Sequence, residues 1–295
     1  MMMKSKNFCE FVKKHRLTIY LILVITISWS IWIPMTLDKF NIIDFRIPII
    51  IGQSIGGFSP LLSLIILDVI SGGSYNLKMI FSSIKFKKEG AIWLFLAAFT
   101  YPLLAITGNI INFLVGNEIQ LNIFQPETLQ LLGFGLIGIV PLLFFVSLFS
   151  SPLLEEPGWR GFTLGQLQRK FGRQLGSFLL GSFWWLWHQP INIVNGLKIS
   201  IYSYISMVAY SFIIDSIFNL SKKNLLCAMF AHSSFAISTR FFMFTFIYQS
   251  TNWFVPLMFL IVIIILRIHE WKKNSISESL TNDQSLYSID SIIRN

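Results

Sequence analysis

Long apolar stretches alternate with short polar segments along most of the chain, and this pattern predicts membrane-spanning helices. Each stretch has about the 20 residues that a helix needs to cross a hydrocarbon core of about 30 Å. The sequence therefore predicts an all-α fold, a polytopic membrane helical bundle with about eight transmembrane helices. The stretches cover residues 17–37, 48–70, 91–116, 129–150, 175–194, 199–220, 224–248 and 253–268.

Some positions within and around these stretches predict packing and orientation. Gly52, Gly56 and Gly57 have the small-residue spacing typical of close helix packing. Basic residues concentrate before the first stretch and after the second, fourth, sixth and eighth. Under the positive-inside rule this alternation places both termini in the cytoplasm. We therefore expect a basic cytoplasmic N-terminus at 1–16, a transmembrane bundle at 17–273 and a disordered polar tail at 274–295. The first stretch is too long for a signal peptide and is expected to stay as a helix.

Composition supports a bilayer as the solvent. Hydrophobic residues make up 54% of the chain and charged residues only 13%, about half of what a soluble domain carries. Orientation and anionic lipid explain the net charge of +9, and no nucleic-acid-binding motif is visible. Cys9 precedes the first stretch and Cys227 lies inside the seventh, so a disulfide framework is not expected. Acylation of Cys9 is an alternative that no other feature supports.

Ionisable residues inside spans are costly and mark functional sites, and here the densest group is Ser151-Pro-Leu-Leu-Glu155-Glu156-Pro-Gly-Trp-Arg160. Glu156 and Arg160 are one helical turn apart and can pair, which leaves Glu155, about 100° round the helix, to face elsewhere. A carboxylate in a low-dielectric site suits a general base. The alternative is a structural ion pair at a helix end, because Pro157 and Gly158 can break the helix. The complete set is Asp68, Glu155, Glu156, Arg160, His188, Asp215, His232 and Arg240.

Two histidines lie inside predicted spans. His188 is in the fifth, one turn after Trp184, and His232 is in the seventh among small residues. A neutral histidine can be a metal ligand or a proton shuttle, although a lone intramembrane histidine more often bonds to a neighbouring helix. At 1.5 Å per residue, His188 lies roughly 20 Å and His232 roughly 12 Å from the cytoplasmic end. Together with Glu155 they are expected in one half of the bilayer, in a site open to the cytoplasm.

At these residues the chain resembles the CPBP family of intramembrane proteases, which includes CAAX prenyl endopeptidases and bacterial relatives linked to bacteriocin processing and immunity. The family's first motif is a Glu-Glu pair followed after three residues by Arg, and Glu155, Glu156 and Arg160 match it. The second motif is an aromatic residue, usually Phe, four before a His. The third is a His with Asn four residues later. The matched core covers 141–236.

The second and third motifs each contain one departure. Trp184 stands where Phe is usual before His188, and Ala236 stands where Asn is expected after His232. Because alanine cannot donate a hydrogen bond, Ser233, Ser234, a water or a neighbouring helix would have to substitute; otherwise the chain is slow or inactive.

The resemblance implies roles for the matched residues. Glu155 and His188 would activate a water, and His232 would donate to the oxyanion. Glu156 and Arg160 would be the supporting pair. A divalent metal, zinc, is the cofactor to consider, with Glu155, His188 and His232 as candidate ligands, although their spacing is not that of soluble zinc proteases.

Three functions follow from these residues. The first is an endopeptidase of a bacterial cytoplasmic membrane that cleaves peptides or lipidated proteins at the cytoplasmic face. The second is a non-catalytic scaffold or bacteriocin-immunity protein of the same fold, which Ala236 favours. The third is a transporter that uses Asp68, Asp215 and Arg240, none of which the resemblance explains. Locally, Asp215 is expected to be solvated or capped near the cytoplasmic end of its span, and Arg240 to snorkel.

Overall fold

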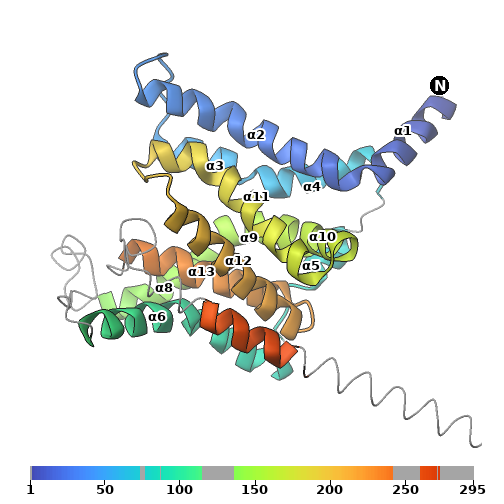
Figure 1. Cartoon of the computed structure of the whole chain (residues 1–295). Helices are drawn as coiled ribbons and strands as arrows, with labels where there is room; N and C mark the ends of the chain where they lie inside the picture. Colours follow the sequence, from blue (N-terminus) through green and yellow to red (C-terminus); the bar gives the residue numbers. More distant parts are fainter. Residues whose placement is uncertain are drawn as a thin grey trace, which may run out of the picture.

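The computed structural model describes residues 2–73, 77–86, 88–114, 136–241, 260–270 and 272, which form helices joined by turns and short loops (Figure 1). The predicted tail at 274–295 and parts of the third, fourth, seventh and eighth apolar stretches lie outside these residues. Residues 260–270 are helical. The other helices are α1 (Met2–Lys14), α2 (Arg16–Lys39), α3 (Ile49–Gly57), α4 (Ser59–Ile70), α5 (Leu77–Ser82), η1 (Lys88–Gly90), α6 (Ala91–Leu114), α8 (Leu136–Leu148), α9 (Ser151–Glu156), η3 (Pro157–Leu164), α10 (Gly165–Phe171), α11 (Arg173–Val194), α12 (Ile201–Leu220) and α13 (Leu225–Phe241).

The predicted all-α class is confirmed for the described residues. Three helical segments there are long and apolar enough to cross a membrane: Arg16–Lys39, Ile49–Ile70 and Ile201–Leu220. Ala91–Leu104 and Leu225–Ser238 are shorter apolar helices. Large apolar side chains also point outward from the bundle, as a lipid-facing surface requires. The count of eight spans stays a prediction.

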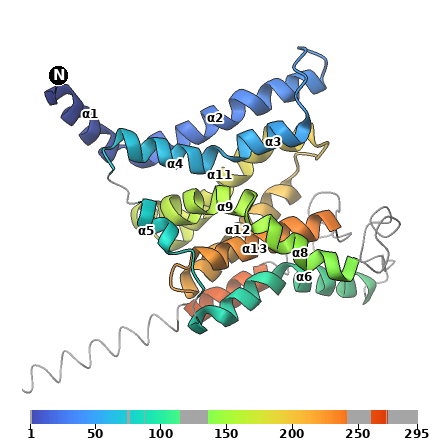
Figure 2. The same ribbon diagram turned by 180° about the vertical axis from the view of Figure 1, so that it is seen from behind.

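The helices are stacked in layers that place α9 and η3 in the interior (Figures 1 and 2). In both views α2, α3 and α4 lie at one side and α6 with α8 at the other. Helix α11 packs between α2 and α12, and α13 packs against α6, α8 and α12. The short segment α9–η3 contacts α4, α11, α12 and α13, so any group on it can meet side chains from both sides of the bundle.

Buried tryptophans and close glycine contacts hold α2 against its neighbours. The rings of Trp32 and Trp187 lie 5.0 Å apart, and the indole N–H of Trp32 donates to the Gly52 carbonyl at 2.9 Å. A Cβ at Gly56 would lie 2.2 Å from Trp32 Nε1. The close packing predicted at Gly52 and Gly56 is therefore confirmed, whereas Gly57 has open space around its Cβ position, and the prediction for it was wrong.

Basic segments that are distant in sequence meet at one end of the bundle. Arg16 Nε donates to Gln166 Oε1 at 2.6 Å, which joins the N-terminal segment to α10. Glu270 accepts ion pairs from Arg173 at 2.6 Å and Arg267 at 3.0 Å, which joins helix 260–270 to the start of α11. Burial raises the pKa of Glu270, and the two arginines oppose the rise. Segments predicted to share the cytoplasmic side thus lie on the same side of the bundle (Figure 1).

Gly158 allows α2 to pass directly over η3, and its substitution should destabilise the protein. A Cβ at Gly158 would lie 2.0 Å from the Tyr20 hydroxyl, which donates to the Pro60 carbonyl at 3.2 Å. We expect Gly158→Ala to cost about 1–3 kcal/mol, the usual penalty of overpacking, measured as a lower Tm in detergent. Adding Tyr20→Phe should recover part of the loss. Gly57→Ala is the control, and a wild-type Tm for Gly158→Ala would contradict this packing.

Candidate active site

The site lies on a helical segment that changes its winding in the middle. Helix α8 ends at Leu148, close to the end of the fourth apolar stretch, and a new helix, α9, starts at Ser151. From Glu156 the chain continues directly into η3, a π-helix. Pro157 has no N–H to continue the α-helical ladder, and π-helical turns are frequent at functional sites. Pro157 therefore does not end the helix, which was the alternative raised by the sequence. The helix changes from α to π winding at this residue and continues.

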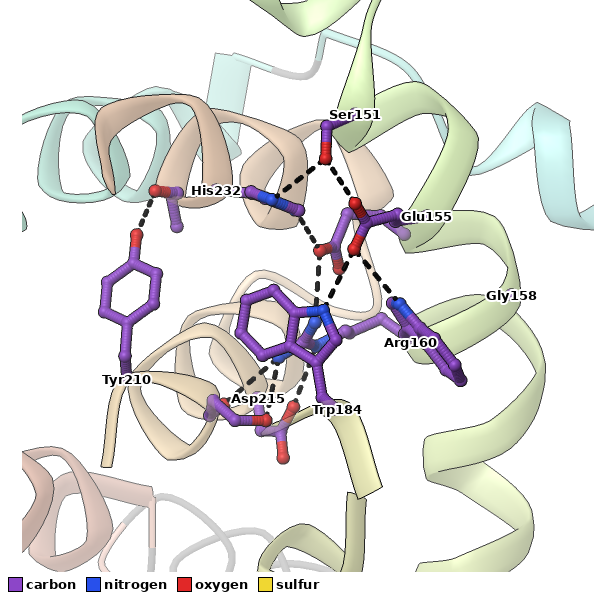
Figure 3. Close-up of polar contacts among 12 residues, drawn as sticks. Ser151, Glu155, Gly158, Arg160, Trp184, Tyr210, Asp215 and His232 are labelled. Atoms are coloured by element: carbon purple, nitrogen blue, oxygen red, sulfur yellow. Dashed lines mark hydrogen bonds and ion pairs between the residues drawn. The ribbon is translucent and has the colours of Figure 1, made fainter. Parts of the chain in front are cut away.

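Neutral donors surround the carboxylate of Glu155, which is 2% exposed. The indole N–H of Trp184 donates to Glu155 Oε2 at 2.9 Å, and that of Trp159 donates to the same oxygen at 3.3 Å. The Ser151 hydroxyl donates to Glu155 Oε1 (Figure 3). No ion pair to Glu155 is formed within the described ranges. Trp184, the residue that departs from the second motif, thus supplies a hydrogen bond that phenylalanine lacks.

The neighbouring Glu156 belongs to a buried charge network. Arg160 contacts Glu156 Oε1 through NH1 at 3.1 Å and Asp215 Oδ1 through Nε at 3.0 Å, and its NH2 donates to Ser211 Oγ at 2.9 Å. Glu156 Oε1 also lies 2.8 Å from Nδ1 of His232 (Figure 3). The predicted pairing of Glu156 with Arg160 is confirmed. Glu156 therefore does two things: it neutralises Arg160 and it orients His232.

The expectation that Asp215 is solvated or capped was wrong. Its side chain is fully buried and pairs with Arg160, which lies 55 residues earlier in the sequence. The physical reason is that a buried guanidinium needs more than one acceptor, and Glu156 alone cannot satisfy all of its donors. Asp215 is thus a member of the charge network.

His188 joins the group through Trp184. Its Nδ1 lies 2.8 Å from the Trp184 carbonyl, one turn back in α11. The Trp184 ring packs edge-on against His188, with ring centroids 5.6 Å apart, and against His232, with centroids 5.3 Å apart. Arg160 lies over the same indole at 5.0 Å. The two histidines therefore flank one tryptophan, whose N–H holds Glu155.

Direct contacts join Glu156 to Arg160 and His232, whereas Glu155 is connected to His232 through Ser151 and to His188 through Trp184. Sequence reasoning missed Ser151 and Trp159 as partners of Glu155. Both stand four residues from it, so helical spacing alone could have found them.

The remaining ionisable candidates lie outside this group. Asp68 is half-buried near the end of α4. The side chain of Arg240 lies outside the described residues.

Of the two serines beside Ala236, Ser234 does not replace the expected Asn. Ser234 Oγ donates to the Ala98 carbonyl at 2.7 Å and so faces α6. Ser233 Oγ is buried and has no hydrogen-bond partner among the described residues.

The candidate metal ligands do not fit a metal ion in this arrangement. Among the described residues, no group of three or more His, Cys, Asp or Glu side chains could hold one. Both oxygens of Glu155 accept from protein donors, and both ring nitrogens of His232 face Glu156 or Ser151. Binding of zinc by Glu155, His188 and His232 stays a prediction.

Comparison with known proteins locates this site within a described family. Residues 137–238, which contain all the residues of the site, match the family of type II CAAX prenyl endopeptidase Rce1-like proteins. Over this segment the chain is similar to the Rce1-like family. A relative is "CAAX prenyl protease 2" of Methanococcus maripaludis, 43% identical over 56 residues. This alignment covers 19% of the chain and 20% of that protein, so the chain spans about a fifth of the length of the curated relative.

This similarity agrees with the resemblance found at the motifs. The family that matches this segment is described as type II CAAX prenyl endopeptidases. The bacterial origin and the link to bacteriocin immunity stay predictions.

Removing Asp215 should destabilise the protein strongly. In Asp215→Ala the buried Arg160 loses one of its two anionic partners, and breaking a buried pair in this way typically costs about 3–5 kcal/mol. We expect a large fall of Tm in detergent. The control is Asp44→Ala, which removes an exposed ion pair with Arg46 and should leave Tm unchanged. Equal Tm values for the two variants would show that Asp215 does not stabilise the buried network.

Proposed function

We propose that this chain is an intramembrane endopeptidase that uses Glu155 and His188 to activate a water and His232 to stabilise the oxyanion. The observation that carries the proposal is the contrast between the two adjacent carboxylates. Glu156 is neutralised by Arg160, whereas Glu155 forms no described ion pair and accepts from Trp184, whose ring packs against both histidines. A carboxylate that is held in place without a counter-charge can accept a proton.

The proposed reaction is hydrolysis of an amide. Glu155 takes a proton from the water, and the resulting hydroxide attacks the carbonyl carbon. His232 donates from Nε2 to the developing oxyanion, while Glu156 at Nδ1 balances the charge of the protonated ring. The C–N bond then breaks, and Glu155 returns its proton to the leaving amine. His188 helps to hold the water beside Glu155.

A cavity of about 660 Å³ beside α13, the helix that carries His232, has room for an apolar part of the substrate. It lies between α6, α8 and α13, and its lining is almost entirely apolar, including Phe95, Phe144 and Phe230. The relatives' names specify a prenyl substrate, and we propose a peptide or lipidated protein substrate for this chain. The basic segments at one end of the bundle support eight spans with the site open to the cytoplasm.

A non-catalytic role as a membrane scaffold or immunity protein is the second candidate, and Ala236 is the observation that favours it. An amide missing at this position removes one donor from the site, and one lost oxyanion donor can cost about 10²–10³ in rate. Under this function, binding or protection in cells would survive Glu155→Ala combined with His188→Ala.

The third hypothesis, a transporter using Asp68, Asp215 and Arg240, loses support because Asp215 is neutralised by Arg160. Proteoliposome uptake that depends on Asp215 and not on Glu155 would restore it.

Glu155→Gln should abolish peptide cleavage. The variant keeps the size and the acceptor oxygen of the side chain but cannot accept the proton, so we expect the rate to fall by about 10²–10⁴, the contribution of a general base. The assay follows cleavage of a farnesylated CAAX peptide and its unlipidated counterpart by the purified chain in liposomes. Glu10→Gln, in the exposed N-terminal helix, is the control. Wild-type activity in Glu155→Gln would reject the proposed mechanism.

Chelation should leave cleavage unchanged. The ligand atoms of Glu155 and His232 already have protein partners, so the proposed reaction needs no metal step. The measurement compares cleavage before and after dialysis against a chelator, with zinc content determined on the same samples. Loss of activity that returns on adding zinc would contradict this arrangement and revive the predicted metal site.

A further inference from the structure

Ser151 occupies a position between the two groups that the proposed reaction depends on. Its hydroxyl donates to Glu155 Oε1, and the same oxygen lies 3.4 Å from His232 Nε2 (Figure 3). Ser151 and His232 are 81 residues apart in the sequence, so this contact joins α9 to α13 across the interior of the bundle. A serine hydroxyl can donate one hydrogen bond while it accepts another, so one atom can serve both partners.

Helix capping does not explain this placement. A serine at the start of a helix commonly satisfies a free backbone N–H of the first turn. Here the N-cap residue is Ser150, and no side-chain cap is formed at this end of α9. The Ser151 hydroxyl is therefore committed to Glu155 and His232 instead of to its own helix end.

Ser151 also completes the orientation of the His232 ring. Glu156 contacts Nδ1 at 2.8 Å, and Ser151 is the described residue at Nε2. The separation of 3.4 Å at Nε2 is longer than the usual 2.7–3.2 Å of an N–H···O bond. Nε2 thus faces the Ser151 hydroxyl that also holds Glu155, and this long contact leaves it able to donate to an incoming oxyanion. One turn after His232, at Ala236, the chain presents only a methyl group.

We infer that Ser151 is a positioning residue of this site, which holds Glu155 Oε1 and the Nε2 edge of His232 against one another. The inference rests on the proposed peptidase function. The contacts of Ser151 can also be tested apart from that function, because its hydroxyl contacts two identified atoms, Glu155 Oε1 and His232 Nε2. Ser151 is half-buried, whereas Glu155 and His232 are buried, which puts its side chain at the accessible rim of the site.

The kinetic test compares Ser151→Ala, Ser151→Thr and Ser150→Ala in the full chain reconstituted in liposomes, with the farnesylated CAAX peptide. We expect kcat of Ser151→Ala to fall by about 100-fold with little change of KM, because a small misplacement of reacting groups can cost this much. Ser151→Thr keeps the hydroxyl and should restore most of kcat. Ser150→Ala removes an exposed hydroxyl that bonds to the Ser147 carbonyl and should behave as wild type. A wild-type kcat in Ser151→Ala would overturn the inference about Ser151. It would leave the proposed reaction standing, because that reaction is tested separately by Glu155→Gln.

A second measurement needs no activity, so it separates the inference from the proposed function. The chain has four histidines, and ¹⁵N-histidine NMR in detergent micelles can follow each ring, with His232→Gln and His188→Gln used to assign the signals. Ser151→Ala should shift the Nε2 signal of His232 and leave those of His188 unchanged; Ser151→Thr should shift neither. An unchanged His232 signal in Ser151→Ala would overturn the inference even in a chain that cleaves no peptide.

Discussion

The buried guanidinium of Arg160 is the constraint on which the arrangement of the site depends. A charge removed from water is tolerated only when its donors are paired, and Arg160 satisfies this with Glu156, Asp215 and Ser211. These partners come from α9 and α12, and Glu156 extends the network to His232 on α13. Pairing one cation therefore fixes the relative positions of helices that are far apart in the sequence. The geometry of His232 is a consequence of that pairing.

The same constraint separates the roles of two adjacent glutamates. Successive residues of a helix point about 100° apart, so Glu156 can face Arg160 while Glu155 faces the indoles of Trp159 and Trp184. Glu156 is part of an ion pair, and among the described residues Glu155 accepts from neutral donors. Two identical side chains in one turn thus have different surroundings, ionic for Glu156 and neutral for Glu155.

Local spacing predicted the features that depend on neighbours in the sequence. The pairing of Glu156 with Arg160 follows from one helical turn, and the helices follow from long apolar stretches. Contacts between distant segments could not be predicted this way. Arg160 pairs with Asp215, 55 residues away. Asp215 was recognised as an ionisable residue inside the sixth apolar stretch, but spacing along the sequence does not identify its partner. The new helix that starts at Ser151 was not predicted either, because its six residues are too few to form an apolar stretch of membrane-spanning length.

The two departures from the family motifs are connected through the partners of Glu155. A phenylalanine at position 184 would pack against both histidines but would leave Glu155 Oε2 with the longer bond from Trp159, 3.3 Å instead of 2.9 Å. An indole packs in the same way and adds a donor. At position 236 the chain has alanine where the motif has Asn, and Ser151 supplies a polar group at Nε2 of His232. Trp184 and Ser151 thus each add a hydrogen-bonding group to the site from a helix other than α13. In a low-dielectric interior, an incomplete polar cluster costs more than an apolar one. If the site had lost only the Asn side chain at position 236, we would expect the buried Glu155 and His232 to be lost as well. This chain has kept both residues.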